Sequence, residues 1–507
     1  MNIQKDGDMK KAYHIIRGWV CTACLCLLAA ACSQMDGGWP DDASCDGDGH
    51  GGSPAGTMFL SVRFSVGGSG PEKRANPGED GDGHEPGDDN ENAVTGVTVF
   101  LFDESADWNT TDGCNASILA AYYFKTGDDL YQEGTSYVTE AVSVEDLGVD
   151  CCKALAVVNV DWTGNVSNRT WTVLGHLRDV PVEDDWLWQG TDPENIRKTN
   201  FLMSSTELVS VTGINGSTKE NPATVRLDVE RLAARVDYRT RTVNGVFDVA
   251  DAGGQTVGQV TVEGAIVVNR LTGKENLFKH VAKTYPSTLA EAEIGRETVD
   301  GSGQAANWVV DAFPGGRKEF DLFLPTLSSH LGWADEFSTG FPMTDVGGTE
   351  WHCLGYVREN TNEISQAAEL RQKATGVVFK ARYDVTGFTS GHDLYRYGGK
   401  LYPDLSSVAQ VAGIPEDGLT NENCAGYGIT YYPGGICYYT YWIKHAEDGD
   451  NDHFGTMEYA IVRNNLYQLT VTSVSGIGDP QPGDSELAIE VAVRNWQAMD
   501  EENVDLQ

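Results

Sequence analysis

The sequence contains few side chains whose types and spacing could catalyse a reaction or bind a metal ion. The stretch DGDGHE, residues 80–85, resembles the start of a calcium-binding loop, but it lacks the third acidic position and the glutamate that such a loop requires. His352 and His445 stand beside aromatic residues of expected strands, which favours structural roles. No nucleophile elbow, zinc-protease, Walker or dinucleotide-binding motif is present. We therefore expect a protein that is not an enzyme and that binds no metal or cofactor.

One polar segment is a candidate site for a different reaction, in which a protease hydrolyses the backbone of the segment. Residues 67–96 separate two strand-like patterns and are far longer than the roughly 2–5 residues of a hairpin loop. Lys73 and Arg74 are the only Lys or Arg residues in it, and Ala75 follows them. Such a segment can enter a protease cleft, whereas Arg63 lies inside an expected strand. The alternative interpretation is an inert acidic linker.

The N-terminus is typical of an exported protein. Reading from Met9, basic residues precede an apolar run at residues 19–31, which is shorter than the roughly 18 residues of a membrane span. The sequence LLAAAC resembles a bacterial lipobox, with Ala29 where a leucine is usual, and it predicts lipidation of Cys32, for example by palmitate. Ordinary secretion with cleavage after the alanine run is the alternative. The true start, Met1 or Met9, stays open.

The charge balance limits the partners. The 36 Lys and Arg residues against 75 Asp and Glu residues give a formal net charge of −39, which would repel a phosphate backbone. We therefore expect no nucleic-acid partner. A length of 507 residues with 40% hydrophobic residues is enough for two or three domains, each with its own core.

Cysteine usage argues against a dense disulfide framework. Three of the 11 cysteines lie in the export signal and a fourth is Cys32, which leaves seven, an odd number. The adjacent Cys151 and Cys152 point to opposite faces of an expected strand, and we interpret them as core residues. Cys424 and Cys437 are the pair whose bonding the sequence leaves open.

Period-two alternation is the dominant structural signal. Leu60, Val62, Phe64 and Val66 share one face of an expected strand, and several later segments repeat the pattern. Helical periodicity is confined to short pieces, such as residues 192–202 and 362–374. We predict an all-β chain of stacked antiparallel β-sandwiches with minor helical insertions.

The alternation also suggests where one domain ends. In VERLAARVDY the phase slips at Leu232 and then resumes, as expected for a strand that passes from one domain into another.

A set of motifs carries a family resemblance. The chain from about Val225 to its end is similar to the fimbrillin (type V pilin) family of Bacteroidetes, and most to the Mfa-type fimbrium subunits. The N-terminal half matches more loosely. The motifs are VERLAARVDY, VVNRLTGKENLF, YVRENTNEISQ, TGVVFKARY, GGICYYTYWIKH, EYAIVRNNLYQLTVTSVSGIGDP and IEVAVRNWQAMDEENVDL.

The resemblance implies a structural subunit of cell-surface fimbriae that supports adhesion. Its fold would be two tandem antiparallel β-sandwich domains of the transthyretin-like, Greek-key type. It would be exported as an outer-membrane lipoprotein precursor, cut by an arginine-specific protease between Arg74 and Ala75, and polymerised by donor-strand exchange. Its partners would be other fimbrial subunits, the protease, the outer membrane through the lipid anchor of the precursor, and a host or bacterial surface ligand.

Together these signals predict a division of the chain into six segments. They are a lipoprotein signal peptide at 1–31, a flexible tether at 32–57, a removable first strand with its cleavage loop at 58–74, an N-terminal domain at 75–231, a C-terminal domain at 232–482, and a donor-strand tail at 483–507.

The first and last strands match each other. Removing residues 58–66 would take away four inward side chains, at about 1.5–3 kcal/mol each, and leave an apolar groove. The tail supplies an equivalent set after the Gly/Pro/Asp-rich stretch at 476–486: Leu487, Ile489, Val491 and Val493. Such a tail could complete a neighbouring subunit by β-strand addition. The alternative is that the tail is the last strand of its own sandwich.

Two other functions stay open at this stage. The aromatic stretch YYPGGICYYTYW, residues 431–442, could stack on sugar rings and make the chain a carbohydrate-binding surface lipoprotein. The chain could also be an accessory or tip subunit of a fimbrium rather than a shaft subunit.

The cleavage hypothesis predicts the first residue of the mature protein. N-terminal sequencing of material sheared from the cell surface should find Ala75, because Lys73 and Arg74 are the only Lys or Arg residues in the polar segments that a protease can enter. A mature protein that begins only at Cys32 would contradict this prediction.

Overall fold

The computed structural model describes the backbone in the following residues: 58–66, 84–108, 110–134, 136–144, 147, 149–182, 187–191, 198–273, 275–279, 281–282, 294–296, 308–310, 319–329, 332–344, 350–361, 364, 366–445, 458–483, 485 and 487–497. They all belong to one contact unit, Ser53–Gln507. The described chain is mostly β-strand with few and short helices, which confirms the predicted all-β class.

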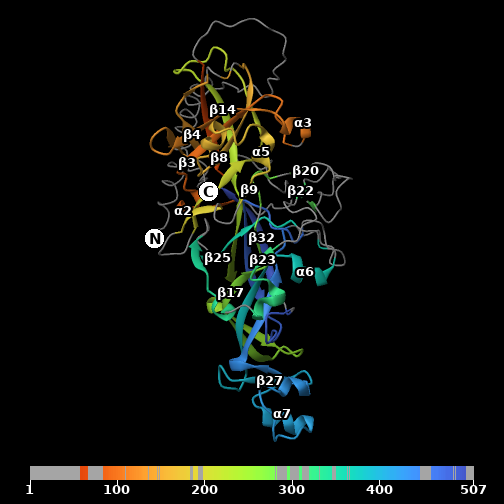
Figure 1. Ribbon diagram of the computed structural model, residues 1–507. Helices are drawn as coiled ribbons and strands as arrows, with labels where there is room; N and C mark the ends of the chain where they lie inside the picture. Colours follow the sequence, from red (N-terminus) through yellow and green to blue (C-terminus); the bar gives the residue numbers. More distant parts are fainter. Residues whose placement is uncertain are drawn as a thin grey trace, which may run out of the picture. The chain divides into compact units, whose positions relative to one another are not determined.

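A ten-stranded sheet contains the first strand of the described chain. Its main path runs β4-β3-β8-β12-β14-β1-β6-β5, while β13 pairs with β8 and β7 pairs with β1. Figure 1 shows β3, β4, β8 and β14 lying together. The bounds are β1 Phe59–Val66, β3 Gly96–Phe102, β4 Ile118–Lys125, β5 Leu130–Glu133, β6 Ser136–Thr139, β7 Val142–Ser143, β8 Cys152–Val158, β12 Met203–Ser205, β13 Val209–Val211 and β14 Ala223–Arg231.

Two further sheets are built largely from later strands. A six-stranded sheet has the order β2-β32-β31-β15-β25-β24, and a four-stranded sheet has the order β16-β17-β26-β30. The bounds are β2 His84–Pro86, β15 Ala233–Thr240, β16 Val246–Ala250, β17 Thr256–Val268, β24 Phe341–Thr344, β25 Glu350–Arg358, β26 Gly376–Val385, β30 Ile436–Trp442, β31 Asn465–Ser473 and β32 Ala488–Gln497.

Smaller sheets and short helices complete the described chain. The small sheets pair β10 Trp188–Thr191 with β11 Lys198–Phe201, β18 Arg270–Thr272 with β23 Glu319–Asp321, β19 Glu275–Asn276 with β9 Pro181–Val182, β22 Trp308–Val310 with β20 Val281–Ala282 and β21 Ile294–Arg296, and β27 Leu394–Tyr397 with β28 Lys400–Tyr402 and β29 Thr430–Tyr432. The α-helices are α2 Asp89–Asn92, α3 Thr111–Cys114, α4 Thr163–Ser167, α5 Leu174–Arg178, α6 Ala367–Lys373 and α7 Leu405–Ala412. The 3₁₀ helices are η4 Val243–Gly245, η6 Leu324–Ser329, η7 Trp333–Asp335, η8 Cys424–Tyr427 and η9 Pro433–Gly435.

The core into which successive strands pack changes at Leu232. Along β14, Val225 and Leu227 pack into the core of the ten-stranded sheet. Along β15, Ala234 and Val236 pack into a second core that the six- and four-stranded sheets share. Leu232 itself packs into a third cluster. The chain therefore changes sheets at the residue where the phase of the sequence pattern slips.

Two local expectations need correction. Residues 198–201 form strand β11 rather than part of a helix, because they pair with β10 and bury Phe201 completely, so packing overrides the weak helical pattern. The second correction concerns Cys151, which is disulfide-bonded and not a free core residue, whereas its neighbour Cys152 is buried and free as expected. Cys424 and Cys437, whose bonding the sequence leaves open, are both buried and free.

His445 has the buried structural environment that its aromatic neighbours suggest. The Tyr467 hydroxyl accepts a hydrogen bond from the Val462 N–H at 2.8 Å and lies 2.9 Å from His445 Nδ1. Burial of the ring favours its neutral form, because a charged imidazolium would lose its hydration. Burial, and secondarily the charge of Lys279, lowers the pKa of His445 from its ordinary value of 6.5 to about 3.

This shift predicts a loss of stability in mild acid. Below about pH 6.5 the unfolded chain binds a proton at His445 that the folded chain does not bind until about pH 3, so stability falls across that window. As the pH is lowered from 6 to 4, the free energy of unfolding should decrease more steeply for the parent protein than for His445→Asn. The difference in slope should be about 1.4 kcal/mol per pH unit. Urea unfolding of both proteins at several pH values measures this difference, and parallel pH profiles would refute it.

Candidate functional site

The four inward residues predicted for the removable strand are core residues of the ten-stranded sheet. Leu60, Val62, Phe64 and Val66 lie in β1, and only 0–4% of the surface of each is exposed. Phe64 stacks on Tyr137 of β6, with ring centroids 5.3 Å apart and planes 12° from parallel. Burial of this completeness makes β1 a large contributor to the stability of the sheet.

β1 has partner strands on both of its edges. It runs parallel to β14, with residues 60–66 opposite residues 223–229. Its other edge pairs antiparallel with β6 and β7. The Thr139 hydroxyl accepts a hydrogen bond from the Val62 N–H at 2.9 Å, and Ser61 Oγ donates to the Thr139 carbonyl at 2.9 Å. The place of β1 is a slot whose two sides are built by later parts of the chain.

The four apolar residues predicted for the donor tail lie at the last described strand. Leu487 immediately precedes β32, and it is buried together with Val493 in the core shared by the six- and four-stranded sheets. Ile489 and Val491 are only half-buried against the same core. Strand β32 pairs antiparallel with β31 of its own chain. The tail thus occupies its own sheet, as in the alternative that the sequence leaves open, but with less complete burial than β1.

The two edges of β32 are covered unequally. Along one edge β31 pairs with residues 488–495. Along the other, the only described partner is β2, which pairs parallel with residues 495–497 alone. On the outward face, Glu490 forms a 2.6 Å ion pair with Arg241, and both side chains are more than half exposed. Such a pair adds little stability.

The Gly/Pro/Asp-rich stretch before β32 is attached to the rest of the structure. Tyr438 and Asp479 exchange two backbone hydrogen bonds of 2.8 and 2.9 Å, and the Thr440 N–H donates to the Ser485 carbonyl at 2.8 Å. The Asp479 carboxylate accepts a hydrogen bond from the Ser485 N–H at 2.9 Å. This stretch is therefore docked against β30 and is not a free hinge.

A buried charged cluster, which we call the Glu91 cluster, fixes the chain just after the predicted cleavage segment. Glu91 of α2 accepts hydrogen bonds from Arg235 at 2.7 Å and from the Tyr356 hydroxyl at 2.5 Å. Arg235 also forms an ion pair of 2.9 Å with Asp237, and Arg231 donates to the Glu91 carbonyl at 3.1 Å. Burial lowers the pKa of Arg231 to about 10 and raises that of Asp237.

Sequence reasoning did not single out the Glu91 cluster. The available signal was the presence of Arg231, Arg235 and Asp237 within the otherwise apolar strands of VERLAARVDY. Charged residues in such strands are buried only when they have partners. Glu91, the partner, comes from a polar stretch distant in sequence, which the local pattern did not connect to them.

The aromatic stretch at residues 431–442 contributes mainly to the interior. Tyr432 and Tyr439 pack in the core shared by the six- and four-stranded sheets, and Tyr438 and Trp442 pack in a neighbouring cluster. Tyr431 stacks on Tyr395, with ring centroids 5.2 Å apart. These rings fill space between elements and do not form an exposed sugar-binding platform.

Several predicted sites lie outside the described residues, namely Cys32, Lys73, Arg74 and Ala75. Within the described part of the chain, no helix is long and apolar enough to cross a membrane. No group of three or more His, Cys, Asp or Glu side chains among the described residues is arranged to hold a metal ion.

The fold and the slot define a class: an all-β protein whose first described strand completes a sheet built by later strands. Residues 430–502 match the family model described as major fimbrial subunit protein type IV, fimbrillin, C-terminal. This match confirms the resemblance to fimbrillins that the sequence motifs indicate. It includes β29 through β32, and thus the predicted donor strand.

Three of the solved structures that match the chain are fimbrial proteins. The tip fimbrial protein Mfa3 from Porphyromonas gingivalis is 11% identical, with a TM-score of 0.37, and the alignment covers 87% of this chain and 100% of that one. A fimbrilin (fimA) from Porphyromonas gingivalis W83 is 13% identical, with a TM-score of 0.38 and coverage of 88% and 99%. A fimbrial assembly protein from Parabacteroides distasonis ATCC 8503 is 10% identical, with a TM-score of 0.29 and coverage of 87% and 96%. No curated protein matches the chain.

The burial of β1 predicts a strong effect of a single substitution. Phe64→Ala should lower the free energy of unfolding of the uncut protein by about 3–5 kcal/mol, because the cavity forms in a packed core. The matched control is Arg63→Ala on the same strand, whose ion pair with Glu133 is largely exposed and should contribute no more than about 1 kcal/mol. Urea unfolding measures both, and equal effects would show that the packing of β1 does not stabilise the sheet.

Proposed function

We propose that this protein is a structural subunit of cell-surface fimbriae that polymerises by donor-strand exchange and supports adhesion. It is exported as a lipoprotein precursor, anchored in the outer membrane through Cys32. An arginine-specific protease cuts it between Arg74 and Ala75. The mature subunit then enters the fimbrium together with other subunits, and the same exchange serves a shaft or a tip subunit. The fimbrillin match at residues 430–502 supports this assignment.

The observation that carries the proposal is the position of β1. All other described residues come after residue 83, so one cut at Arg74 separates β1 from them. The strand nevertheless sits inside the ten-stranded sheet, between β14 on one edge and β6 and β7 on the other. A central strand that one cut detaches is the arrangement that strand replacement requires.

The register of the slot fits the tail. Leu60, Val62, Phe64 and Val66 lie opposite alternate residues of β14, from Ala223 to Val229. An incoming strand needs four apolar side chains with the same period of two, which residues 487, 489, 491 and 493 supply. In their own sheet Ile489 and Val491 are half-buried, so transfer to the slot removes more of their apolar surface from water.

The energy balance explains why cleavage acts as the switch. Four donor side chains in an empty slot contribute on the order of 6–12 kcal/mol. Association costs an estimated 4–15 kcal/mol, and the tail must also leave β31. While β1 is still attached to its own chain, it refills the slot without that association cost. A donor strand can therefore displace β1 only after β1 has been cut from its own chain.

We further propose that residues 75–231 and 232–482 form two tandem transthyretin-like β-sandwich domains. The change of sheet and of core at Leu232 supports this division. The Glu91 cluster joins the two parts, because it links α2 and the end of β14 to β15 and β25.

The exchange can be tested with a peptide, so that the subunit itself is not altered. A synthetic peptide of residues 485–497 should bind the subunit after treatment with an arginine-specific protease. It should not bind a Lys73→Ala, Arg74→Ala subunit, in which β1 stays attached and blocks the slot. Size-exclusion chromatography with a fluorescent peptide measures the complex.

Two peptide variants distinguish specific binding in the slot from nonspecific binding. Val491→Asp should abolish binding, because an unpaired carboxylate would enter an apolar slot. Glu490→Gln should bind as the parent peptide does, since this side chain faces outward. Equal binding of the two variants, or binding to the uncut double variant, would contradict donor-strand exchange.

A further inference from the structure

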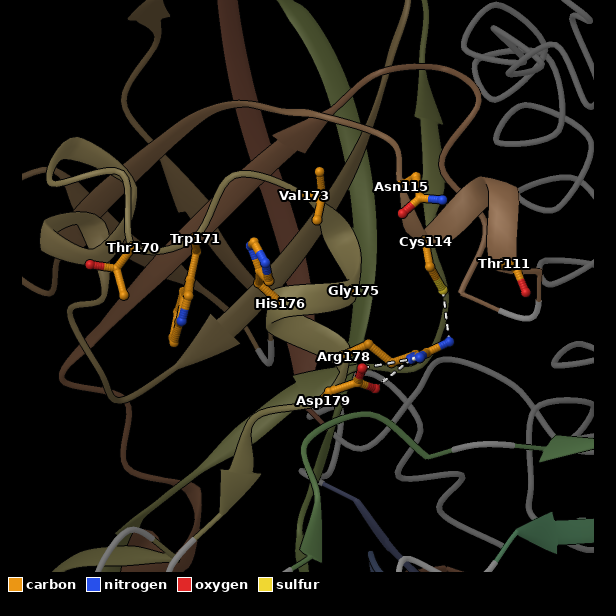
Figure 2. A pocket seen from close by; sticks show the side chains of 10 residues that line it. All are labelled: Thr111, Cys114, Asn115, Thr170, Trp171, Val173, Gly175, His176, Arg178 and Asp179. Atoms are coloured by element: carbon orange, nitrogen blue, oxygen red, sulfur yellow. Dashed lines mark hydrogen bonds and ion pairs between the residues drawn. The ribbon is translucent and has the colours of Figure 1, made fainter.

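A hollow in the first half of the chain has no role in strand exchange. It lies between α3 and α5 and has a volume of about 570 Å³, within the range of small-molecule sites. Figure 2 shows its lining, with Trp171 and His176 on one side and Arg178 reaching toward Cys114 on the other. The lining combines one large aromatic ring with several polar side chains, and polar groups of this kind fix the orientation of a bound ligand.

The walls of the hollow are held together by backbone hydrogen bonds. The segment after α3 pairs with the segment before α5 through an antiparallel bridge between Ser117 and Val173. The Ile118 N–H donates to the Thr172 carbonyl at 2.9 Å, and the Leu174 N–H donates to the Ala116 carbonyl at 3.0 Å. The site is therefore preformed, which lowers the entropy lost on binding.

The one guanidinium group in the lining is already neutralised. Arg178 donates from Nε and Nη2 to the two carboxylate oxygens of Asp179, at 2.7 and 3.1 Å. Its Nη1 donates to the Cys114 sulfur at 2.8 Å and to the Trp108 carbonyl at 3.4 Å. All three nitrogens have protein partners, so the lining provides no unengaged cation to hold a phosphate or a carboxylate. An anionic ligand is disfavoured.

The aromatic ring of the lining is fixed from behind. Trp171 is half-buried and makes an edge-to-face contact with Trp162, with ring centroids 5.3 Å apart and planes at 90°. It also contacts Phe100 at a centroid distance of 6.4 Å. An indole ring held in this way can take an apolar ring face against it without losing further conformational freedom.

The remaining polar groups of the lining can form hydrogen bonds with the hydroxyl groups of a ligand. His176 Nδ1 accepts a hydrogen bond from the Thr172 N–H at 3.1 Å, so the neutral ring carries its proton on Nε2. Asn115 and Thr170 are exposed, and the carboxylate of Asp179 is 63% exposed. This set offers amide, imidazole and hydroxyl donors together with carboxylate and carbonyl acceptors. A sugar ring presents the matching groups, hydroxyls that both donate and accept.

We propose that this hollow binds a neutral saccharide of one or two rings. Trp171 stacks on the apolar face of one sugar ring, while Asn115, His176 and Asp179 form hydrogen bonds with its hydroxyls. The proposal goes beyond fimbrial assembly, because the hollow is complete within a single uncut chain. It also differs from the sugar platform considered for residues 431–442, whose rings are mostly buried.

The test uses the full-length Lys73→Ala, Arg74→Ala protein, so that a failure of polymerisation does not affect it. An array of neutral and acidic glycans is probed first, and the bound glycans are then titrated by calorimetry. Binding to neutral glycans is expected. Trp171→Ala should weaken it by about tenfold or more, and Asn115→Ala or Asp179→Ala by about 3- to 10-fold each.

The exposed positions keep the test decisive even if Trp171→Ala fails to fold, since Asn115 and Asp179 bury little surface. The control is Tyr427→Ala, which removes an exposed aromatic side chain in η8 that does not line the hollow, and it should bind as the parent protein does. An array without bound neutral glycans, or binding that the Asn115 and Asp179 variants leave unchanged, would overturn the proposal.

Discussion

Strand β14 needs a neighbour on the edge that β1 occupies, and the account of this protein depends on that constraint. The inward residues of β14 belong to the same core as those of β1, and the sheet continues beyond β1 to β6 and β5. An empty slot would expose apolar surface and unpaired backbone groups in the middle of the sheet, not at its edge. Either β1 or another strand of similar pattern has to fill it.

β1 and the chain that follows the predicted cut are held in place by different interactions. β1 is held by apolar packing and by ladder hydrogen bonds, which any strand with the right period can reproduce. The chain after the predicted cut is held by the Glu91 cluster, whose buried charges require particular partners in particular positions. Under the proposed mechanism, this contrast would allow β1 to be exchanged while the chain after it stays in place. Among the described strands, only β2 covers the outer edge of β32, over residues 495–497, which would ease the release of β32.

Local sequence pattern predicted much of the fold, because period-two alternation reports directly which strand face is buried. It identified the inward residues of β1 and the change of core at Leu232. It did not identify the Glu91 cluster or the hollow beside α5, since both bring together segments that are distant in sequence. It also assigned residues 198–201 to a helix, where pairing with β10 and burial of Phe201 decide for a strand. The role of the tail stays a prediction.

The most direct measurement is a cryo-electron microscopy map of filaments assembled from the cut protein. Donor-strand exchange predicts that the density beside β14, in the place of residues 60–66, traces to residues 487–493 of a neighbouring subunit. The map should show each subunit completed by the next in this way. A map in which residues 60–66 still lie beside β14, and β32 still pairs with β31 of its own chain, would contradict the account.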